Sequence, residues 1–346
     1  MNTKNGAAHK TPELLAPGGD WEALKAACAN GADAVYFGLP AFNARMRAAN
    51  FATDELPELM DYLHSRNIRG YLAMNTLAYQ HELEEAARIV ALAASCGVDA
   101  LILQDVGLAA LAARMAPTLA LHASTQMTLS SPDALRRAER LGIRRVILPR
   151  ELPLDEIKIL AAATPLELEV FVHGALCISY SGQCQASLAL GGRSANRGEC
   201  AQPCRLPYTV LADGLAPTDR KRIYPLSPRD LAAWPLIPEL VAAGVKSFKI
   251  EGRLKNACYV AAAVRLYRAA IDAALAGREF APDPDDEAAL RQTFSRGFTR
   301  GFIGGANRVE MVDGLTPKPR GVRLGEVLEV RPNTLLVRLD KGDETA

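Results

Sequence analysis

Short apolar runs alternate with amphipathic helical stretches through most of the chain. The first run, at 13–17, is followed by a helical stretch that begins at Asp20, a residue favoured as an N-cap, and stops near Gly31. Continuous apolar runs are typical of parallel strands that helices cover on both faces. The runs lie at 13–17, 32–38, 69–75, 99–105, 119–124, 144–149, 168–173 and 247–252. Eight such units predict an α/β fold of the (β/α)8 TIM-like barrel type, and they favour it over a doubly wound open sheet.

The repeat stops after Gly277, so we expect the barrel over 12–280, after a disordered tail at 1–11. Residues 282–287, PDPDDE, are acidic and contain proline, which predicts a linker. Beyond it, 321–330 and 334–340 alternate apolar and polar residues around RPN, which predicts a β-hairpin. Two strands are marginal alone, so we expect 281–346 to be a linker and the start of a small β-barrel-like module. That module would borrow strands or continue in a longer protein.

Polar residues follow most of the predicted strands, where a barrel enzyme builds its active site. They include Asn75, Ser124 and Gln126, then Arg150, Glu151, His173, Glu251 and Arg253. Loops are polar in general, so a single residue of this kind is weak evidence for a site.

Four cysteines lie in the segment that follows the seventh predicted strand, within the cysteine-rich loop 173–205. They are Cys177, Cys184, Cys200 and Cys204, with six, fifteen and three residues between neighbours. Thiolates are the preferred ligands of iron–sulfur clusters and of zinc. Structural zinc sites usually pair ligands two to four residues apart, a spacing that only Cys200 and Cys204 have. The segment therefore predicts an iron–sulfur cluster, with zinc as the main rival.

The other three cysteines, Cys28, Cys96 and Cys258, fall at apolar positions of helical stretches. There we expect them to be small hydrophobic core residues.

The segment EVFVHGALCISYSGQCQAS, at 169–187, resembles the signature of the collagenase-like peptidase U32 family, apart from Ala186, where a larger aliphatic residue is usual. ELLAPGGDWEALKAACANGADAVYFG, NRGECAQPCR and SFKIEGRLK are also similar to this family, so the resemblance extends from about residue 12 to residue 305. The stretch LALGGRSANRGECAQPCRLPYTVLADG looks closest to the branch that forms 5-hydroxycytidine in 23S rRNA. Despite its name, the family implies iron–sulfur proteins of oxygen-independent hydroxylation, acting on tRNA, on 23S rRNA or on the ubiquinone ring.

The resemblance implies Cys177, Cys184 and Cys200 as ligands of a [4Fe-4S] cluster. Some relatives take the fourth ligand after an Asp-Leu pair, where this chain has Ala232, and others take it from the position of Cys204. We therefore expect Cys204 as the fourth ligand. The resemblance also implies prephenate as an oxygen donor or co-substrate.

Other catalytic candidates rest on position. Strand alternation puts Glu169 and His173 on one face, so both would flank the cysteine loop if that face points into the barrel. Arg150, Glu251 and Arg253 would position the substrate.

The chain is nearly neutral, with a net charge of +1, but residues 193–255 hold eleven basic residues against six acidic ones. Such a patch suits RNA phosphates, and the Arg/Phe/Gly stretch at 294–302 would add stacking faces. An ordinary solvated basic face is an equally good interpretation. The expected partner is RNA, either 23S rRNA or its precursor.

Other functions remain open. A U32-type peptidase would lack both an HExxH helix and a GxSxG elbow and would rest on a Cys177–His173 dyad. Ubiquinone-ring hydroxylation with a partner chain, and a noncatalytic cluster-binding role, are the further alternatives. The polar N-terminus and the lack of a long apolar run predict a cytoplasmic protein without a membrane segment.

Overall fold

Eight parallel strands close into a barrel in the computed structural model, which describes residues 11–211, 213, 223–305 and 310–340. Closure is made by β9, which pairs with β1 on one side and with β7 on the other, Phe248 being opposite both Leu14 and Val170. The predicted barrel is confirmed and the open sheet is excluded. Nearly all of the predicted disordered tail lies outside the described residues. The barrel strands are β1 (Glu13–Pro17), β2 (Ala34–Phe37), β3 (Arg69–Met74), β4 (Ala100–Leu103), β5 (Ala120–Ala123), β6 (Ile143–Ile147), β7 (Glu167–Ala175) and β9 (Ser247–Ile250).

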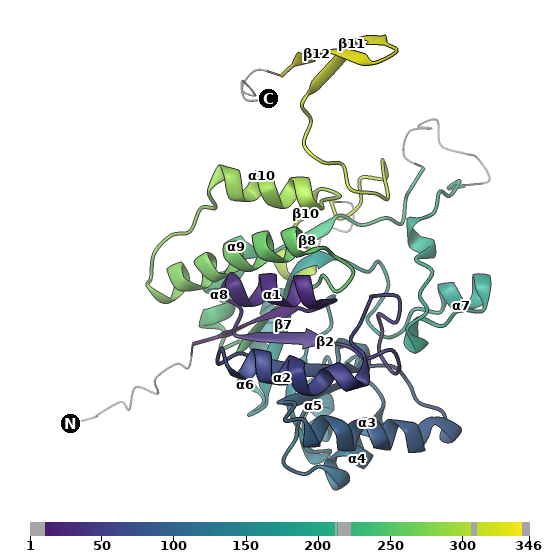
Figure 1. Cartoon of the computed structure of the whole chain (residues 1–346), viewed down its shortest axis with the longest axis vertical. Coiled ribbons are helices and arrows are strands. Elements are labelled where there is room, and N and C mark those ends of the chain that lie inside the picture. The colour runs from purple at the N-terminus through teal and green to yellow at the C-terminus, as the bar shows by residue number, and fades with distance from the viewer. Residues whose placement is uncertain (1–10, 212, 214–222, 306–309, 341–346) are drawn as a thin grey trace.

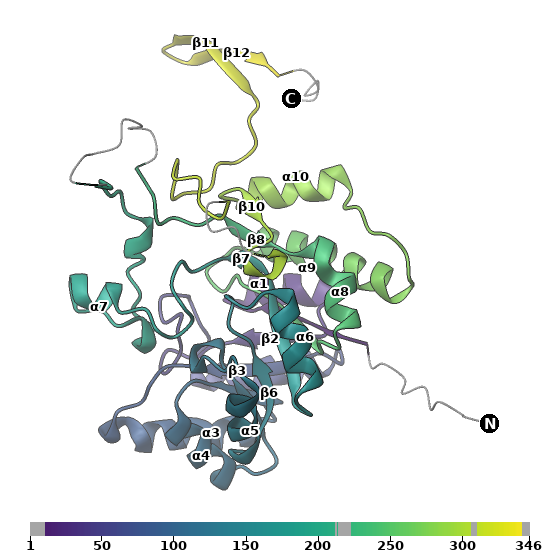
Figure 2. The same cartoon turned by 180° about the vertical axis from the view of Figure 1, so that it is seen from behind.

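Helices surround the barrel and cover its apolar strands (Figures 1 and 2). Asp20 caps the first helix as predicted, because its side chain accepts a hydrogen bond of 2.8 Å from the Ala23 amide. Among the helices of the described ranges, none combines the length and the hydropathy that a membrane span requires. The surrounding helices are α1 (Trp21–Ala29), α2 (Leu56–His64), α3 (Leu83–Ser95), α4 (Val106–Met115), α5 (Pro132–Arg140), α6 (Leu154–Ala162), α8 (Ile237–Ala242) and α9 (Ala257–Leu275).

Two short strands extend the sheet beyond the barrel, and the sequence pattern did not predict them. The end of β7 pairs antiparallel with β8 (Asp230–Ala232), which pairs parallel with β10 (Phe298–Thr299). Both are too short to show a period. The cysteine-rich segment, with helix α7 (Ala186–Gly191), connects β7 to β8. Because β8 pairs with the C-terminal end of β7, both ends of the segment lie at that end of the barrel.

The acidic stretch 282–287 is not a linker throughout, because helix α10 (Pro284–Thr293) begins within it. Asp283 caps this helix, accepting a 2.9 Å hydrogen bond from the Asp285 amide. Acidic residues in a first turn favour a helix because they face its positive end. Asp286 also forms an ion pair with Arg265 of α9 at 2.6 Å. The acidic run that was predicted as a linker therefore contains the first turn of a helix.

The predicted hairpin is present as β11 (Gly325–Arg331) and β12 (Thr334–Leu339), paired antiparallel. It stands away from the barrel (Figures 1 and 2), and its apolar side chains are exposed, Val330 at 71%. Its membership of a larger β module stays a prediction.

Candidate active site

A cavity of about 660 Å³ opens at the C-terminal ends of the barrel strands, between these ends and the cysteine-rich segment. This is where (β/α)8 enzymes carry their chemistry. Its wall includes side chains from β2, β3, β4, β6, β7 and β9 and from the loops that follow most of the barrel strands.

All four predicted cysteine ligands line this one cavity, although up to 27 positions separate them in the chain. Each of Cys177 and Cys204 lies within electrostatic range of the other cavity cysteines. Burial raises the pKa of Cys204 to about 11, against the opposing charge of Arg205, and burial also raises the pKa of Cys177. The thiols of Cys177 and Cys204 are therefore protonated at neutral pH when free, and a bound metal would have to displace their protons.

The four thiols do not form a site for a single ion. Among the residues that the structure describes, no three or more His, Cys, Asp or Glu side chains are arranged to hold a metal ion. Zinc needs its thiolates about 2.3 Å from one centre, so the thiols would have to move together to bind it. A four-iron cluster attaches each thiolate to a different iron and so spreads its ligands more widely. The chemistry of the four thiols fits an iron–sulfur cluster, and thiolates are also ligands of zinc.

Hydrogen bonds fix the first half of the cysteine segment to the strand ends. Glu151, predicted only as a strand-end residue, accepts from the Ser181 amide at 3.0 Å and from its hydroxyl at 2.8 Å. Thr128 donates to the Ser181 carbonyl at 2.7 Å. Gly182 has a φ of +72°, and a Cβ there would lie 2.2 Å from the Gln126 carbonyl oxygen. Only glycine permits this close approach.

Arg205 fixes the second half of the segment. Its guanidinium donates to the Ser227 hydroxyl at 2.7 Å and to the Leu176 carbonyl at 3.2 Å. Leu176 precedes Cys177 and Arg205 follows Cys204, so this contact joins the two ends of the cysteine set.

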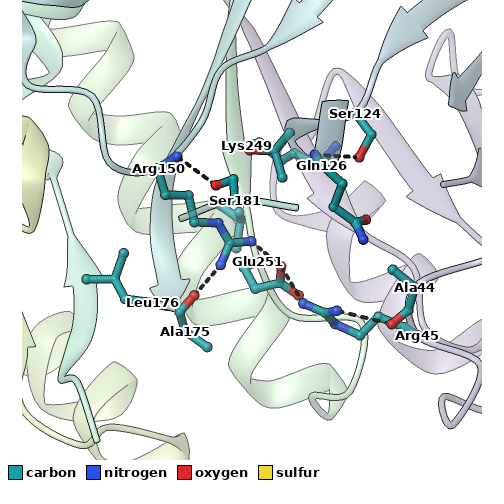
Figure 3. Close-up of polar contacts among 12 residues, drawn as sticks. Ala44, Arg45, Ser124, Gln126, Arg150, Ala175, Leu176, Ser181, Lys249 and Glu251 are labelled. Carbon is teal, nitrogen blue, oxygen red and sulfur yellow. Dashed lines mark hydrogen bonds and ion pairs between the residues drawn. The ribbon is translucent and has the colours of Figure 1, made fainter. Parts of the chain in front are cut away.

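Glu251 joins two arginines of the cavity lining (Figure 3). One of its oxygens lies 3.1 Å from Arg45 and 2.5 Å from Arg150. Burial alone would raise the pKa of Glu251, but the charges of Arg45 and Arg150 outweigh it and lower the pKa to about 2. This carboxylate is ionised at any physiological pH and serves as an anchor for the arginines, not as a proton donor.

Arg253 lies beside this group and has no carboxylate partner among the described residues. It is 3% exposed and donates through one nitrogen to Asn43, and its Nη1 has no hydrogen bond to the described part of the chain. Burial lowers its pKa to about 10. Arg150, Glu251 and Arg253, predicted from strand-end position, are thus brought together at the cavity.

The cavity is strongly basic. Glu251 is the one carboxylate among the lining residues that the structure describes, against eight basic side chains. They are Arg45, Arg47, Arg150, Arg205, Lys249, Arg253, Lys255 and Arg296. Of these, Arg205, Lys249, Arg253 and Lys255 belong to the predicted basic stretch, whereas Arg220, Lys221 and Arg222 lie outside the described residues.

Arg45 and Arg47 were missed because they follow the short strand β2 in a loop with no recognisable motif. Arg296 does come from the Arg/Phe/Gly stretch. The aromatic residues of that stretch are not free stacking faces, however, because Phe294 packs on Tyr259 and Phe298 on Trp234.

Glu169 and His173 do not flank the cysteine loop as a pair. Glu169 is fully buried below the cavity and binds Lys249 at 3.0 Å. A register shift between Phe171 and His173 interrupts the alternation of β7. His173 therefore packs outside the cavity lining, against rings that include Tyr267.

The Cys177–His173 dyad of a peptidase is also absent from this geometry. The His173 ring meets the Tyr267 hydroxyl at 3.4 Å through Nδ1, and Nε2 has no partner among the described residues. Burial lowers the pKa of His173 to about 3, which makes it a poor base near neutral pH.

The remaining cysteines lie outside the cavity lining. Cys28 and Cys96 are partly buried against the core, close to the prediction. Cys258 is exposed, so its prediction as a core residue was wrong. Cys258 lies on α9, where neighbouring alanines and tyrosines form the buried face. The apolar character of this stretch led to the wrong prediction that Cys258 is buried with them.

Comparison with known proteins identifies the family. The family model described as peptidase family U32 matches residues 19–313. The chain is 38% identical to the 23S rRNA 5-hydroxycytidine C2501 synthase of Escherichia coli over 93% of its own length, and 40% identical to an uncharacterized protease of Methanocaldococcus jannaschii over 84%. It is 35% identical over 78% of its length to the tRNA hydroxylation protein P1 of Bacillus subtilis.

These matches cover 50%, 72% and 65% of the relatives, so the chain spans about half the length of the Escherichia coli protein. A family model that covers most of the chain, and a relative 40% identical over most of its own length, agree with the cysteine signature at 169–187. The chain belongs to peptidase family U32.

Proposed function

We propose that this protein is an iron–sulfur-dependent, oxygen-independent RNA hydroxylase that forms 5-hydroxycytidine in 23S rRNA. The observation that supports it most is the convergence of four cysteines and eight basic side chains on one barrel-mouth cavity. Relatives named for hydroxylation of rRNA and of tRNA support the reaction class.

In this proposal, Cys177, Cys184, Cys200 and Cys204 hold a [4Fe-4S] cluster at the cavity wall. The cluster would supply one-electron transfer that protein side chains cannot provide. The wall already surrounds the thiols with the cations of Arg150 and Arg205, which favour the thiolate form that a cluster needs.

The basic side chains would hold the RNA. A pyrimidine within a duplex is stacked and out of reach, so the target nucleotide must be unpaired and turned into the cavity. Arg45 and Arg150, both oriented by Glu251, then face the incoming nucleotide. Exposed Arg47 and half-buried Lys255 would contact phosphates nearer the surface.

Prephenate as co-substrate is the more specific part of the proposal. It is a dicarboxylate, and Arg253 offers an unpartnered guanidinium nitrogen beside the anchored pair of arginines. An anion there would supply the partner that a buried cation otherwise lacks.

The test is mass spectrometry of rRNA from a deletion strain that carries wild-type or variant protein, with a quinone assay alongside. Loss of 5-hydroxycytidine on deletion, its return with wild type and with Cys258→Ser, and its absence with Cys184→Ser are expected. Cys258 is the matched control, since it is an exposed cysteine outside the cavity. Unchanged cytidine hydroxylation on deletion, with or without lost quinone, would overturn the proposal.

A further inference from the structure

An amide side chain with free donors faces the cavity next to the cysteine segment. Gln126 lies on the short 3₁₀ turn Thr125–Met127 that follows β5. Its Oε1 accepts a 3.1 Å hydrogen bond from Asn75 Nδ2, whereas its Nε2 has no partner among the described residues. Figure 3 shows this side chain extending from the turn toward Ala44, beside the Arg45–Glu251–Arg150 group.

The orientation of the Gln126 amide follows from the hydrogen bonds around it. The Ala44 amide can only donate, and it lies 2.9 Å from Asn75 Oδ1. The NH2 group of Asn75 must therefore face Gln126, and the side-chain oxygen of Gln126 must accept its hydrogen bond. The Gln126 NH2 group is left as a fixed pair of donors that points into the cavity.

The backbone of Gln126 is fixed as firmly as its side chain. The Ser124 hydroxyl accepts from the Gln126 amide at 3.4 Å, and Thr128, in the left-handed region at φ 57°, ends the turn. The close packing of Gly182 on the Gln126 carbonyl and the bond from Thr128 to Ser181 join this turn to the cysteine segment. The donor pair thus keeps a constant position relative to the cysteines.

An aromatic ring stands on the same wall. Tyr180 lines the cavity, lies between Cys177 and Cys184 in the chain, and is 59% exposed. The Gln183 amide donates to the Tyr180 carbonyl at 3.2 Å and holds its backbone in a turn. Exposed aromatic rings in basic clefts are the usual stacking platforms for unpaired bases.

We propose that Tyr180 and Gln126 form a nucleobase subsite, in which the target base stacks on Tyr180 and takes hydrogen bonds from the Gln126 NH2 group. This rests on the proposed function and makes it specific for cytosine. Cytosine N3 accepts a hydrogen bond from one N–H of the Gln126 amide, whereas uracil presents an N–H of its own at N3. An amide donor at this position therefore matches cytosine and meets a second donor in uracil.

The test measures equilibrium binding of the full protein to a short single-stranded RNA with one central cytidine. The same RNA with a uridine or an abasic nucleotide at that position gives the contribution of the base. The variants are Gln126→Glu, which replaces the donors by a carboxylate, Tyr180→Ala, and Tyr180→Phe, which keeps the ring. The controls are Gln292→Glu on α10 and Leu190→Ala on α7, both exposed and outside the cavity lining.

We expect wild type and both controls to bind the cytidine RNA about tenfold more tightly than the abasic RNA, the scale of one base stacked on an aromatic ring. Tyr180→Ala should lose most of that difference and Tyr180→Phe should keep it. Gln126→Glu should lose the preference of cytidine over uridine. Thermal melting of each variant verifies that it is folded.

Equal affinity of wild type for the cytidine and abasic RNAs, or variants that keep the wild-type differences, would overturn the subsite. Hydroxylation of rRNA by the same wild-type protein is measured separately. Hydroxylation without base-dependent binding would overturn the subsite alone, and base-dependent binding without hydroxylation would overturn the proposed function alone.

Discussion

The lower barrel and the cavity above it both hold buried charges, but in opposite arrangements. Below the cavity, three carboxylates meet three cations, and each has an oppositely charged partner within 3.5 Å. We call this the floor network; it consists of Glu13, Glu167 and Glu169 with Arg69, Arg145 and Lys249. Among the described residues of the cavity lining, a single carboxylate faces eight basic side chains, of which only Lys249 and Arg296 pair with a carboxylate outside the lining.

The difference separates charges that serve the fold from charges that serve a ligand. Burying an ion without a partner costs several kcal/mol, so a purely structural set is expected to be balanced. The floor network meets that expectation. The cavity does not, and its surplus of positive charge is the reason for our proposal that an anion, such as RNA phosphate, completes it.

The largest expected effect is on stability, from breaking the floor network. Arg145→Met should lower the free energy of unfolding by about 3 kcal/mol, because it removes the cation that buried Glu13 and Glu169 share and leaves each of them with a single cationic partner. Denaturant titration measures this. Arg144→Met, an exposed neighbour on the same strand, should change stability by less than about 0.5 kcal/mol. Equal effects of the two variants would show that the network is not a structural unit.

Glu251→Gln should have a smaller effect, about 2 kcal/mol, since Arg45 keeps some access to solvent and only one carboxylate is lost. Because the loss leaves surplus positive charge, added sulfate should restore more stability to this variant than to wild type or to Arg145→Met. Thermal melting with and without sulfate measures the excess. A rescue of equal size in all three proteins would contradict the idea of an anion-accepting cavity.

Removing a single surface cation should alter the salt dependence of RNA binding. Arg47→Gln should weaken binding regardless of base and lower the slope of log K against log salt by about 0.7–1. Arg88→Gln on α3, 71% exposed and outside the cavity lining, is the control and should leave the slope unchanged. An unaltered slope for Arg47→Gln would remove this residue from the RNA surface.

The smallest expected effect depends on pH. Burial, aided by the charge of Arg296, lowers the pKa of Lys255 to about 7. Between pH 7 and the ordinary lysine pKa of about 10.4, the unfolded chain binds a proton that the folded chain does not, so stability rises with pH over this window. Lys255→Met should flatten that rise in denaturant titrations at several pH values, and the exposed Lys158→Met should not. Parallel curves for wild type and Lys255→Met would mean that Lys255 stays charged.

The barrel could be read from the sequence because each unit repeats a strong pattern, an apolar run and then a capped helix such as the one at Asp20. The short strands β8 and β10 could not, since two or three residues carry no period. Helix α10 was not predicted, because acidic residues are typical of the first turn of a helix as well as of a linker. His173 was misplaced because alternation was carried across the register shift in β7.

The candidate site, like the fold, could be predicted from the sequence only in part. Cysteine spacing pointed to Cys177, Cys184, Cys200 and Cys204, and all four line the cavity. Strand-end positions pointed to Gln126, but its free donors depend on Asn75 and Ala44, which lie more than fifty residues away in the chain. Such hydrogen bonds form between residues that are far apart in the chain, so they produce no periodic pattern in the sequence.

The proposed function depends on whether the four cavity thiols hold one iron–sulfur cluster. Anaerobic purification followed by an absorption spectrum and by iron and sulfide assays answers this question. We expect a brown protein with about four irons and four sulfides per chain, unchanged in Cys258→Ser and lost in Cys184→Ser. A colourless, iron-free protein, or one zinc per chain, would contradict it.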